Sequence, residues 1–520
     1  MKNKLTRRMV KLVVLIISAM LVLSACGNNS EVGGKIKIND GNSSLITKEP
    51  TELTIFYVRN DNNLTEELDV WKEVAKKTNV TLKTTNSTNV SDANLMLNTM
   101  LASGELPDMI IFSNIKKYAE QYGKEGAFAP IDELISDDTP NIKAQFERPE
   151  VKNFITATDG HVYYVPKILP GNIPANGWFI RQDWLDKLGL KTPTTVDEYY
   201  EVLKAFRDKD PNGNGKADEI PFFCRFKNAD GLLEMQNVPA GWGIKDGNVC
   251  YYPATQEYKD AISLVAKWYA EDLIDKEIFT RGSKSREKLF GENLGGSTHD
   301  YFGTTAQFND LLAESVPGFK VVAIEPVGGK EYTTRAITHT GGAVISAAST
   351  KKEVAIRFLD YLYSEEGSRF MNFGIEGQQY DMKDGKPYYN DSILHGNDTA
   401  INELASVGAC SDFPFIQDFW YEEQWLTEEA LKGFKLYKDT NCCVEPFPTL
   451  SYTDEELNRF TILETNIMTY VDEYKQKWIM GSENVEATFD AYIKGLEKMG
   501  IKEFEEIQQK AYDRYMKANK

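Results

Sequence analysis

Short apolar segments that alternate with amphipathic segments constrain the fold of this chain more than any other feature. Residues 53–58 (LTIFYV) and 109–112 (MIIF) have the length and apolar character of buried strands. Residues 64–77 repeat apolar side chains at helical spacing and predict an amphipathic helix. Further strands are predicted over 319–324 and 343–346. Strands that alternate with helices predict an α/β protein whose sheets are mainly parallel.

Capping signals place several helices. A Thr-x-x-Glu capping box starts at Thr195 and a second starts at Thr350, each ahead of an apolar stripe at helical spacing. A short helix is predicted over 184–188, and from Thr453 onward the chain reads as almost entirely helical. Trp184 and Trp268 lie on apolar helix faces, so we assign them to core packing.

The amino terminus combines a basic segment with an apolar run over residues 13–23. That run is too short for a membrane span, which needs roughly 20 apolar residues, and it indicates a secretory signal. It ends in LSACG at 23–27, which resembles the lipobox of bacterial lipoproteins. We therefore expect a signal peptide over 1–25 and an acyl chain, such as palmitate, on Cys26. An ordinary cleaved signal next to a cysteine is the alternative.

Composition supports a protein held at the outer face of the cell membrane by lipid. Residues 27–50 are rich in Gly, Asn and Ser and predict a flexible tether, so 26–50 is the lipidated cysteine and its tether. The chain has a formal net charge of −19, and loss of the basic residues in 1–25 makes it more acidic. Such a surface repels phosphate backbones, so nucleic acid is not an expected partner.

The cysteines give little guidance. No Cys-x-x-Cys motif is present, and an odd number remains besides Cys26. The sequence allows a disulfide between Cys224 and Cys250, whereas the adjacent Cys442 and Cys443 are poorly placed to bridge each other. The redox state of these cysteines and of Cys410 is not determined by the sequence.

A loop over 208–221 (DKDPNGNGKADEIP) carries the sharpest local motif. Calcium prefers six to eight oxygen ligands at alternate positions of a tight loop. A count that starts at Asp208 also fits the EF-hand pattern, but residues 220–226 look like a strand and not an exit helix. A solvated Asn-Gly turn is the alternative. The candidate ligands are Asp210, Asn212, Asn214, the Lys216 carbonyl, Asp218 and Glu219.

Several phrases, taken in their order, resemble the extracellular solute-binding proteins of ABC sugar importers, in the lipoprotein branch that carries oligosaccharides. The resemblance covers nearly the whole chain after residue 50. The phrases are LPDMII at 106–111, GHVYYVP at 160–166, IRQDWLDKLGL at 180–190, DLIDKE at 272–277, FLDYLYSEEG at 358–367 and GIEG at 374–377.

The resemblance implies a two-lobed fold of the periplasmic-binding-protein type, in which a hinge closes the lobes over a ligand. It implies a first lobe of 51–168 and 318–375 and a second lobe of 169–317 and 376–520, with Pro166 and Pro170 near a hinge crossing. It also favours calcium in the Asp210 register as a structural ion. The implied partners are an oligosaccharide and ABC permease subunits, and the implied state is a monomer.

Ligand residues are predicted from the rule that sites in two-lobed α/β proteins lie beyond the carboxyl ends of strands. Sugars are held by aromatic rings and by planar polar groups in a cleft. With 26 Phe, 26 Tyr and 8 Trp in the chain, most aromatic residues belong to the core. The candidate ligand residues are Tyr57, Arg59, Asn60, Ser113, Asn114, Trp242, Tyr301 and Trp420.

Two other functions compete with this expectation. A secreted glycoside hydrolase needs two placed carboxylates, and pairs are too easily found among 78 Asp and Glu to mean much. No Gly-x-Ser-x-Gly or His-Glu-x-x-His motif is present, and His161, His299, His339 and His395 are scattered, so we do not expect an enzyme. The same fold with a peptide or another small solute as ligand is the serious alternative.

Overall fold

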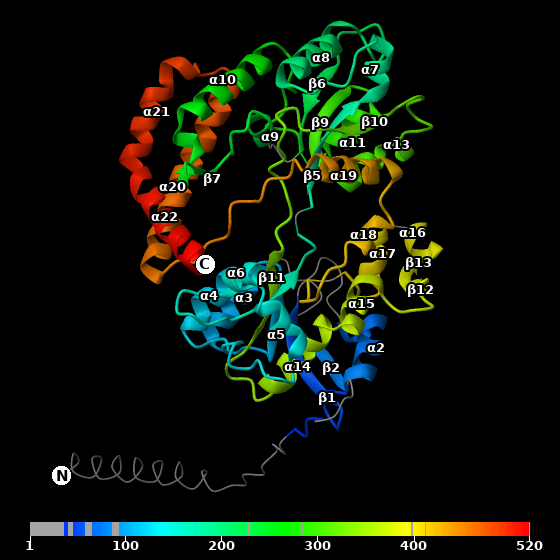
Figure 1. Ribbon diagram of the computed structural model, residues 1–520, viewed down its shortest axis with the longest axis vertical. Coiled ribbons are helices and arrows are strands. Elements are labelled where there is room, and N and C mark those ends of the chain that lie inside the picture. Colours follow the sequence, from blue (N-terminus) through cyan, green and yellow to red (C-terminus); the bar gives the residue numbers. More distant parts are fainter. Residues whose placement is uncertain are drawn as a thin grey trace, which may run out of the picture.

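The computed structural model describes residues 36–39, 45–57, 65–85, 93–171, 173–225, 229–282, 284–396, 399–410 and 412–518. The predicted signal peptide, the predicted lipidation site Cys26 and the predicted ligand residues Arg59 and Asn60 lie outside these residues. Figure 1 shows two bodies, one above the other, joined by extended segments near the middle of the molecule. We call the lower body the first lobe and the upper body the second lobe.

The first lobe is built on a five-stranded sheet in the order β2-β1-β3-β11-β4. The predicted strand at 109–112 coincides with β3, and all four of its side chains are buried. The predicted strand at 53–58 corresponds to β1, whose last three described residues are buried. The strands are β1 (Thr51–Tyr57), β2 (Val80–Thr84), β3 (Met109–Phe112), β4 (Val165–Ile168) and β11 (Thr338–Ile345).

The second lobe is built on a four-stranded sheet in the order β10-β5-β9-β6. Two separate hairpins, β7–β8 and β12–β13, lie outside the two main sheets. The strands are β5 (Asn176–Arg181), β6 (Ile220–Phe223), β7 (Trp242–Lys245), β8 (Asn248–Tyr251), β9 (Gly295–Tyr301), β10 (Val321–Ile324), β12 (Tyr380–Lys383) and β13 (Lys386–Tyr389).

Both main sheets are mixed and not mainly parallel as the alternation of elements predicted. β1 pairs in parallel with β2 and β3, and β6 pairs in parallel with β9. Within these two sheets every antiparallel pair involves β5 or β11: β5 pairs with β9 and β10, and β11 pairs with β3 and β4. These are strands next to the segments that pass between lobes, so the reversal of direction follows from the chain leaving a sheet and returning to it.

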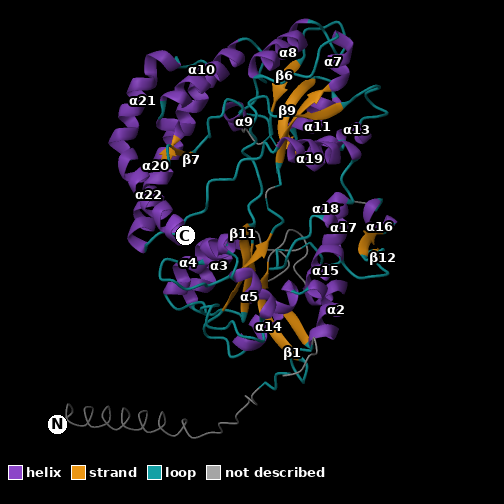
Figure 2. Ribbon diagram, in the orientation of Figure 1, coloured by secondary structure: helices purple, strands orange, loops and turns teal. Residues whose placement is uncertain are grey.

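Helices cover the first sheet (Figure 2). The helix predicted over 64–77 is present as a short 3-10 turn followed by α2. The capping box predicted at Thr350 is wrong: Lys351 is the N-cap of α14 and makes no side-chain cap bond, and its N–H is held by Ser349 Oγ at 3.0 Å. The elements are η1 (Thr65–Glu67), α2 (Asp69–Thr78), α3 (Ala93–Ser103), α4 (Ile115–Lys124), α5 (Pro140–Phe146), α6 (Pro149–Ile155), α14 (Lys352–Tyr363), α15 (Glu365–Phe373), α16 (Asp391–Leu394) and α17 (Ala400–Ser406).

Three predicted helix ends in the second lobe are confirmed. Gly189 ends α7 in the left-handed region at φ 66°, Thr195 Oγ1 caps α8, and Thr453 forms a complete capping box at the start of α20. The elements are α7 (Gln182–Leu188), α8 (Val196–Asp208), α9 (Asp230–Glu234), η2 (Tyr252–Ala254), α10 (Gln256–Ala270), α11 (Ser285–Gly291), α12 (Phe302–Ala306), α13 (Phe308–Leu311), α19 (Glu428–Thr440), α20 (Asp454–Ile479), α21 (Val485–Met499) and α22 (Ile501–Ala518). The short helix α18 (Trp420–Glu423) belongs to the first lobe, because Tyr421 packs in the first core.

Each lobe has its own hydrophobic core. The first core gathers side chains of β1, β3, β11 and their covering helices, and two further clusters fill the second lobe. Trp184 and Trp268 are both buried in the second lobe, which confirms their assignment to packing. Separate cores of this kind are what allows two lobes to move as units.

The structure corrects two of the expected lobe boundaries. Residues 321–324, expected in the first lobe, form β10 and pair with β5 in the second sheet. The hairpin β12–β13 and helices α16, α17 and α18, expected in the second lobe, belong to the first. Tyr380 and Tyr389 meet the ring of Phe373 at 5.9 and 5.6 Å between centroids, and Ile393, Leu404 and Tyr421 are buried in the first core. Local patterns in the sequence do not show which body a short strand or hairpin joins.

Helices α20, α21 and α22 form a column beside β7 and α10 (Figure 1). The start of this column also reaches the first lobe. Ser451 Oγ lies 3.1 Å from Glu120 Oε1 and 3.1 Å from the Thr156 carbonyl oxygen. Lys124 and Asp454 form an ion pair. The two lobes therefore touch at a point far along the chain from the segments that join their sheets.

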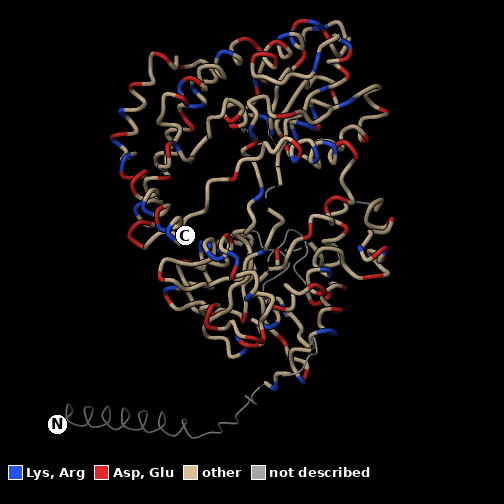
Figure 3. The backbone as a smooth tube through the Cα atoms, viewed as in Figure 1, with Lys and Arg blue, Asp and Glu red and all other residues tan. Residues whose placement is uncertain are grey.

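Cys224 and Cys250 are not joined by a disulfide, and Cys442 and Cys443 do not bridge each other. Basic and acidic residues are interspersed over both lobes (Figure 3). In the part of the chain that the structure describes, no helix has both the length and the apolar character needed to cross a membrane.

Candidate functional site at the facing edges of the two sheets

Two crossing segments determine which edges of the sheets face each other. Residues 169–175 run from the end of β4 to the start of β5, and residues 325–337 run from the end of β10 to the start of β11. In the first sheet Ile168 is opposite Thr338, and in the second Trp178 is opposite Ile324. Both segments therefore join the same edge of the first sheet to the same edge of the second. We call these two the facing edges.

The facing edge of the first lobe carries Ser113 and Asn114, which follow β3 and are both exposed. Gly341 packs closely against Ser113: a Cβ added at Gly341 would lie 2.8 Å from the Ser113 carbonyl oxygen. His339 shares the edge; its Nδ1 accepts the Gly341 N–H at 2.9 Å, and burial lowers the pKa of its ring. An uncharged imidazole, a hydroxyl and an amide thus lie at this edge.

Tyr57 does not share this exposure. It is the last residue of β1, and the structure buries it to 2% exposure with its ring centroid 5.2 Å from that of Phe413. The strand-end rule placed it at the correct edge, but the β1 side chain points into the first core. In this conformation the ring is closed off by packing and is not open to a ligand.

The facing edge of the second lobe surrounds a small cavity of about 90 Å³ lined by Asn176, Arg225, Asp300 and Tyr301, among others. Antiparallel pairing sets Asn176 opposite Tyr301, which brings an amide beside a phenol. Tyr301 is 49% exposed, although it is a large aromatic residue at the end of a buried strand. An exposed ring beside planar polar groups is suited to a hydroxyl-rich ligand.

Asp300 is the electrostatic centre of this edge. Arg225 donates to both of its carboxylate oxygens, at 2.7 Å from Nε and 2.5 Å from Nη2, and Arg286 Nη1 lies 3.5 Å away. The Arg225 guanidinium also sits 5.0 Å from the Tyr301 ring centroid. Asp300 and Arg286 are each 4% exposed, and burial lowers the pKa of Arg286. The Arg225 side chain and the Tyr301 ring are thereby held in a fixed relation.

Behind the edge lies a buried pair, His299 and Glu331. His299 Nε2 is 3.1 Å from Glu331 Oε2, and its ring stacks on Trp178 at 4.8 Å. Burial alone would lower the pKa of His299, but the Glu331 carboxylate raises it above its ordinary value. Burial raises the pKa of nearby Glu234 to about 7. The contact between Glu331 and His299 joins the second crossing segment to β9. The Glu331 backbone N–H donates to the Cys442 carbonyl and so joins the same segment to the residues after α19.

Trp242 lies in a different cavity, of about 540 Å³, between the start of β7 and helix α20. Its ring rests on Phe504 at 4.7 Å and Tyr251 at 4.8 Å between centroids. Asp230, the first residue of α9, also lines this cavity, while Gly231 lines the cavity at Tyr301. The two cavities are therefore separated by the first turn of α9.

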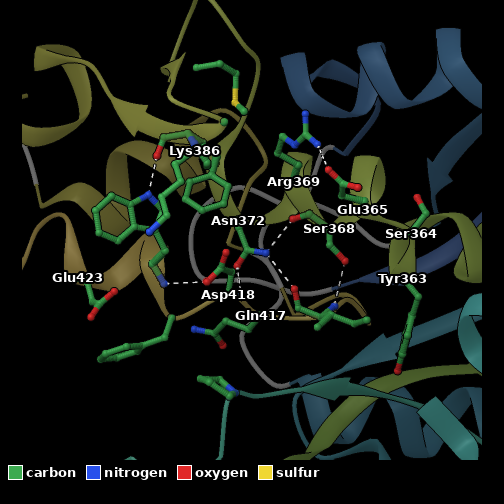
Figure 4. Close-up of a pocket in the computed structure, with 18 residues that line it drawn as sticks. Tyr363, Ser364, Glu365, Ser368, Arg369, Asn372, Lys386, Gln417, Asp418 and Glu423 are labelled. Carbon is green, nitrogen blue, oxygen red and sulfur yellow. Dashed lines mark hydrogen bonds and ion pairs between the residues drawn. The ribbon is translucent and has the colours of Figure 1, made fainter. Parts of the chain in front are cut away.

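Trp420 lines a third and larger pocket of about 830 Å³ beside the hinge (Figure 4). Its indole N–H donates to the Pro387 carbonyl at 2.7 Å, and Lys386 Nζ lies 4.9 Å from its ring centroid. Asn372, from α15, holds the pocket wall by donating to the Ser368 and Ile416 carbonyls at 2.8 and 2.9 Å. Pro170, in the first crossing segment, completes one side.

The loop between α8 and β6 folds around the carboxylate of Asp210. The Asp210 carboxylate accepts backbone N–H groups from Gly213, Asn214 and Gly215 at 2.9 to 3.0 Å. Gly213 and Gly215 both have φ 76°, which bends the chain around these oxygens. The Asn212 and Asn214 amides donate to Asp218 Oδ1 at 3.2 and 3.0 Å.

Glu219 differs from the other loop side chains in that its carboxylate is buried. It is 8% exposed, and both of its carboxylate oxygens are buried with no hydrogen-bond partner. Burial raises its pKa. An unpartnered buried carboxylate is costly unless a cation neutralises it. The donor set fits calcium, which takes carboxylate, amide and backbone oxygens.

Asp208, which begins the alternative register, is turned away from the loop. Its carboxylate is exposed and bonded to the Arg207 guanidinium at 2.7 and 3.0 Å. Among the described residues no three His, Cys, Asp or Glu side chains gather into a metal-binding group. A cation in this loop would therefore depend on amide and backbone oxygens in addition to carboxylates.

A sequence model of the bacterial extracellular solute-binding proteins matches residues 61–369. The chain belongs to this family. The predicted resemblance and the two-lobed α/β fold are thereby confirmed. Among curated proteins it is similar to the fructooligosaccharide ABC transporter substrate-binding protein FusA of Streptococcus pneumoniae, with 28% identity over 98% of each chain. It is also similar to the polygalacturonan/rhamnogalacturonan-binding protein YtcQ of Bacillus subtilis, with 26% identity over 85% of this chain and 88% of that protein.

Solved structures show the same architecture for this solute-binding protein. The alginate-binding protein AlgQ2, solved without calcium ion, superposes with a TM-score of 0.77 at 36% identity, over 91% of this chain and 100% of that one. FusA in complex with kestose superposes with a TM-score of 0.70 at 26% identity, with the same coverage. A further FusA structure carries an EF-hand mutation and fructo-nystose.

The structure distributes the predicted ligand residues of this solute-binding protein over several places and does not gather them in one cavity. Ser113, Asn114 and Tyr301 lie on the facing edges, whereas Trp242 and Trp420 line separate pockets. Sequence reasoning missed Arg225 and Asp300. Arg225 follows β6 by two residues and Asp300 lies in β9 next to Tyr301, so both lie at the edge that the strand-end rule selects, but only the contact between the two side chains shows their role.

Proposed function

We propose that this chain is an extracytoplasmic substrate-binding protein of an ABC transporter, which captures an oligosaccharide between its facing edges and delivers it to permease subunits. The single observation that carries this is the half-exposed Tyr301 held beside Arg225, Asp300 and Asn176 at an edge that faces the other lobe. A ring for stacking next to amide, guanidinium and carboxylate groups suits the paired hydroxyls of a sugar. The names of FusA, YtcQ and AlgQ2 support a saccharide ligand.

Ligand capture would proceed by closure of the lobes about the crossing segments 169–175 and 325–337. Ser113 and Asn114 would meet the ligand from the first lobe, and Tyr301 and Arg225 from the second. The chain's own residues bind and enclose the ligand; the proposal includes no chemical step, in keeping with relatives that are binding proteins. Arg59 and Asn60 belong to the same proposal as residues that follow β1.

The loop at 210–219 would hold one structural calcium ion through Asp210, Asn212, Asn214, the Lys216 carbonyl, Asp218 and Glu219. The buried, unpartnered Glu219 carboxylate supports this. The loop joins α8 to the start of β6, and β6 pairs in parallel with β9, which ends at Tyr301. The ion would therefore stabilise the end of the second sheet that is opposite the ligand site. The ion's contribution would be positive charge that neutralises the buried Glu219 carboxylate.

A thermal-shift screen of saccharides and peptides tests the ligand class. A ligand present at 100 times its Kd stabilises the folded protein by about 2.7 kcal/mol, so an oligosaccharide should raise the melting temperature clearly. Tyr301→Ala should abolish the shift, while Tyr301→Phe should keep most of it because the stacking ring remains. Stabilisation by peptides and by no saccharide would overturn the sugar assignment in favour of the same fold with another solute. Shortened products after incubation with oligosaccharides would indicate a hydrolase.

Lipid anchoring through Cys26 has its own test. A Cys26→Ser form should move from the membrane fraction to the soluble fraction, because a cleaved lipoprotein without the acyl chain has nothing to insert in the bilayer. The same form should bind oligosaccharide with unchanged affinity, because Cys26 is not among the predicted ligand residues. The tether expected over 26–50 is shorter than predicted, since Ile36 and Ile46 already pack on the first core. Membrane retention of this form, or loss of its ligand binding, would contradict the proposed role of Cys26.

A further inference from the structure

The cavity that contains Trp242 has features that the proposed site at Tyr301 does not use. Its volume is about 540 Å³, and it opens between the β7–β8 hairpin, the start of α9 and one face of α20. The lining combines aromatic rings with carboxylates, an amide and one ammonium group. The chemically important residues are Trp242, Tyr251, Asp230, Glu464, Asp472 and Gln476.

The aromatic wall is rigid. Trp242 is only partly buried, and its ring is backed by Phe504 and Tyr251, with Phe460 at 6.5 Å between centroids. Tyr251 is opposite Trp242 in the hairpin, and its backbone N–H donates to Glu505 Oε1 at 3.2 Å. An aromatic surface held from behind and open in front is available for stacking at little cost in conformational entropy.

The polar wall comes from one face of α20. Glu464, Asp472 and Gln476 recur at helical spacing, so their side chains project in the same direction. Lys475 Nζ bonds to Asp230 Oδ1 at 2.9 Å and to Asp472 Oδ1 at 3.0 Å, which joins α20 to the start of α9. Two of the three carboxylates thus contact the single ammonium group, Glu464 adds a third carboxylate to the lining, and the cavity as a whole is acidic.

This cavity and the one at Tyr301 lie on the two sides of one short element. Asp230 lines the first and Gly231 lines the second, and these are the first two residues of α9. Gly231 lies so close to His299 that an added Cβ would come within 2.6 Å of its Nδ1. A ligand that extends from Tyr301 in this direction would have to pass over the first turn of α9 to reach Trp242.

We propose that the Trp242 cavity is a second sugar subsite, which takes the distal residues of an oligosaccharide whose other end lies at Tyr301. This rests on the proposed function. The subsite selects uncharged sugar residues, because its three carboxylates repel a carboxylated ring while they accept hydrogen bonds from neutral hydroxyls. The number of sugar residues that reach Trp242 then determines how strongly chain length affects affinity.

Titration calorimetry with a series of neutral oligosaccharides of increasing length tests the subsite. In the wild type, affinity should rise at least tenfold from the shortest ligand to the longest. Trp242→Ala and Gln476→Ala should each remove most of this rise and leave the affinity for the shortest ligand unchanged. Gln476 is exposed on α20, so its replacement should leave folding intact. Thr469→Ala, an exposed position on the same helix that does not line the cavity, is the matched control and should behave as wild type.

A length dependence that persists in both Trp242→Ala and Gln476→Ala would overturn the subsite and leave the proposed function standing. An equal gain with oligosaccharides of uronic acids would overturn its selectivity for uncharged rings. Wild-type protein that binds no oligosaccharide of any length would instead overturn the proposed function, and the subsite with it.

Discussion

Replacement of Asp300 by alanine should lower the free energy of unfolding by about 3–5 kcal/mol. The change leaves two guanidinium groups, Arg225 and Arg286, without their shared carboxylate in a nearly dry environment; the Arg225 side chain is 10% exposed and the Arg286 side chain 4%. An unpaired buried charge costs more than the pair contributed, because water cannot solvate it. Urea unfolding followed by circular dichroism measures the loss.

The chain offers a matched control for Asp300→Ala. Arg459 and Glu503 form the same two-point contact, at 2.8 and 2.6 Å, but both side chains are 46% exposed. Glu503→Ala should cost no more than about 1 kcal/mol, since water replaces the lost partner. Equal losses in the two variants would show that burial is not what makes Asp300 important. The same Asp300 variant should weaken ligand binding, because the Tyr301 backbone N–H donates to Asp300 at 2.7 Å.

Elements fixed by their immediate neighbours were predictable from the sequence. The strand at 109–112 is bounded by Pro107 and Asn114, and its four consecutive apolar residues are all buried. The start of α20 follows from Thr453 and Glu456, whose reciprocal bonds need only three residues of chain. In each case the deciding interaction is local, so the sequence contains all of it.

Features decided by distant partners were not predictable. Residues 321–324 are an apolar run of ordinary appearance, and only pairing with β5 assigns them to the second lobe. The capping box at Thr350 failed because Ser349, which also donates to Asp108 at 2.6 Å, takes the Lys351 N–H first. A tertiary contact outweighed a local signal worth about 1 kcal/mol.

The candidate site shows the same division. The strand-end rule identified the edge that carries Ser113, Asn114 and Tyr301, because strand ends can be read from apolar patterns. It does not say which of the two faces a side chain takes, and Tyr57 therefore proved to be a core residue. Arg225 was missed because its role comes from Asp300, which is 75 residues away in the chain. Pairings of this length leave no local mark.

Calcium should raise the melting temperature of the chain, and a chelator should reverse the increase. At 1,000 times its Kd a bound ion stabilises the native state by about 4.1 kcal/mol. The physical reason lies in Glu219, whose two buried oxygens have only weak backbone contacts, from Glu219 itself and from Asn212, and whose charge the ion would neutralise. Glu219→Gln should remove most of the calcium-dependent shift, and differential scanning calorimetry with calcium or chelator measures it in both proteins.

The control for the calcium prediction decides between the two registers of the loop. Asp208→Asn removes a carboxylate of the same kind two residues before Asp210, but this carboxylate is bonded to Arg207 on the exposed side of α8. It should leave the calcium-dependent shift intact, whereas Asp210→Asn should abolish it. The opposite result would favour the register that begins at Asp208. A melting temperature that calcium and chelator leave unchanged in the wild type would reduce the loop to an Asn-Gly turn.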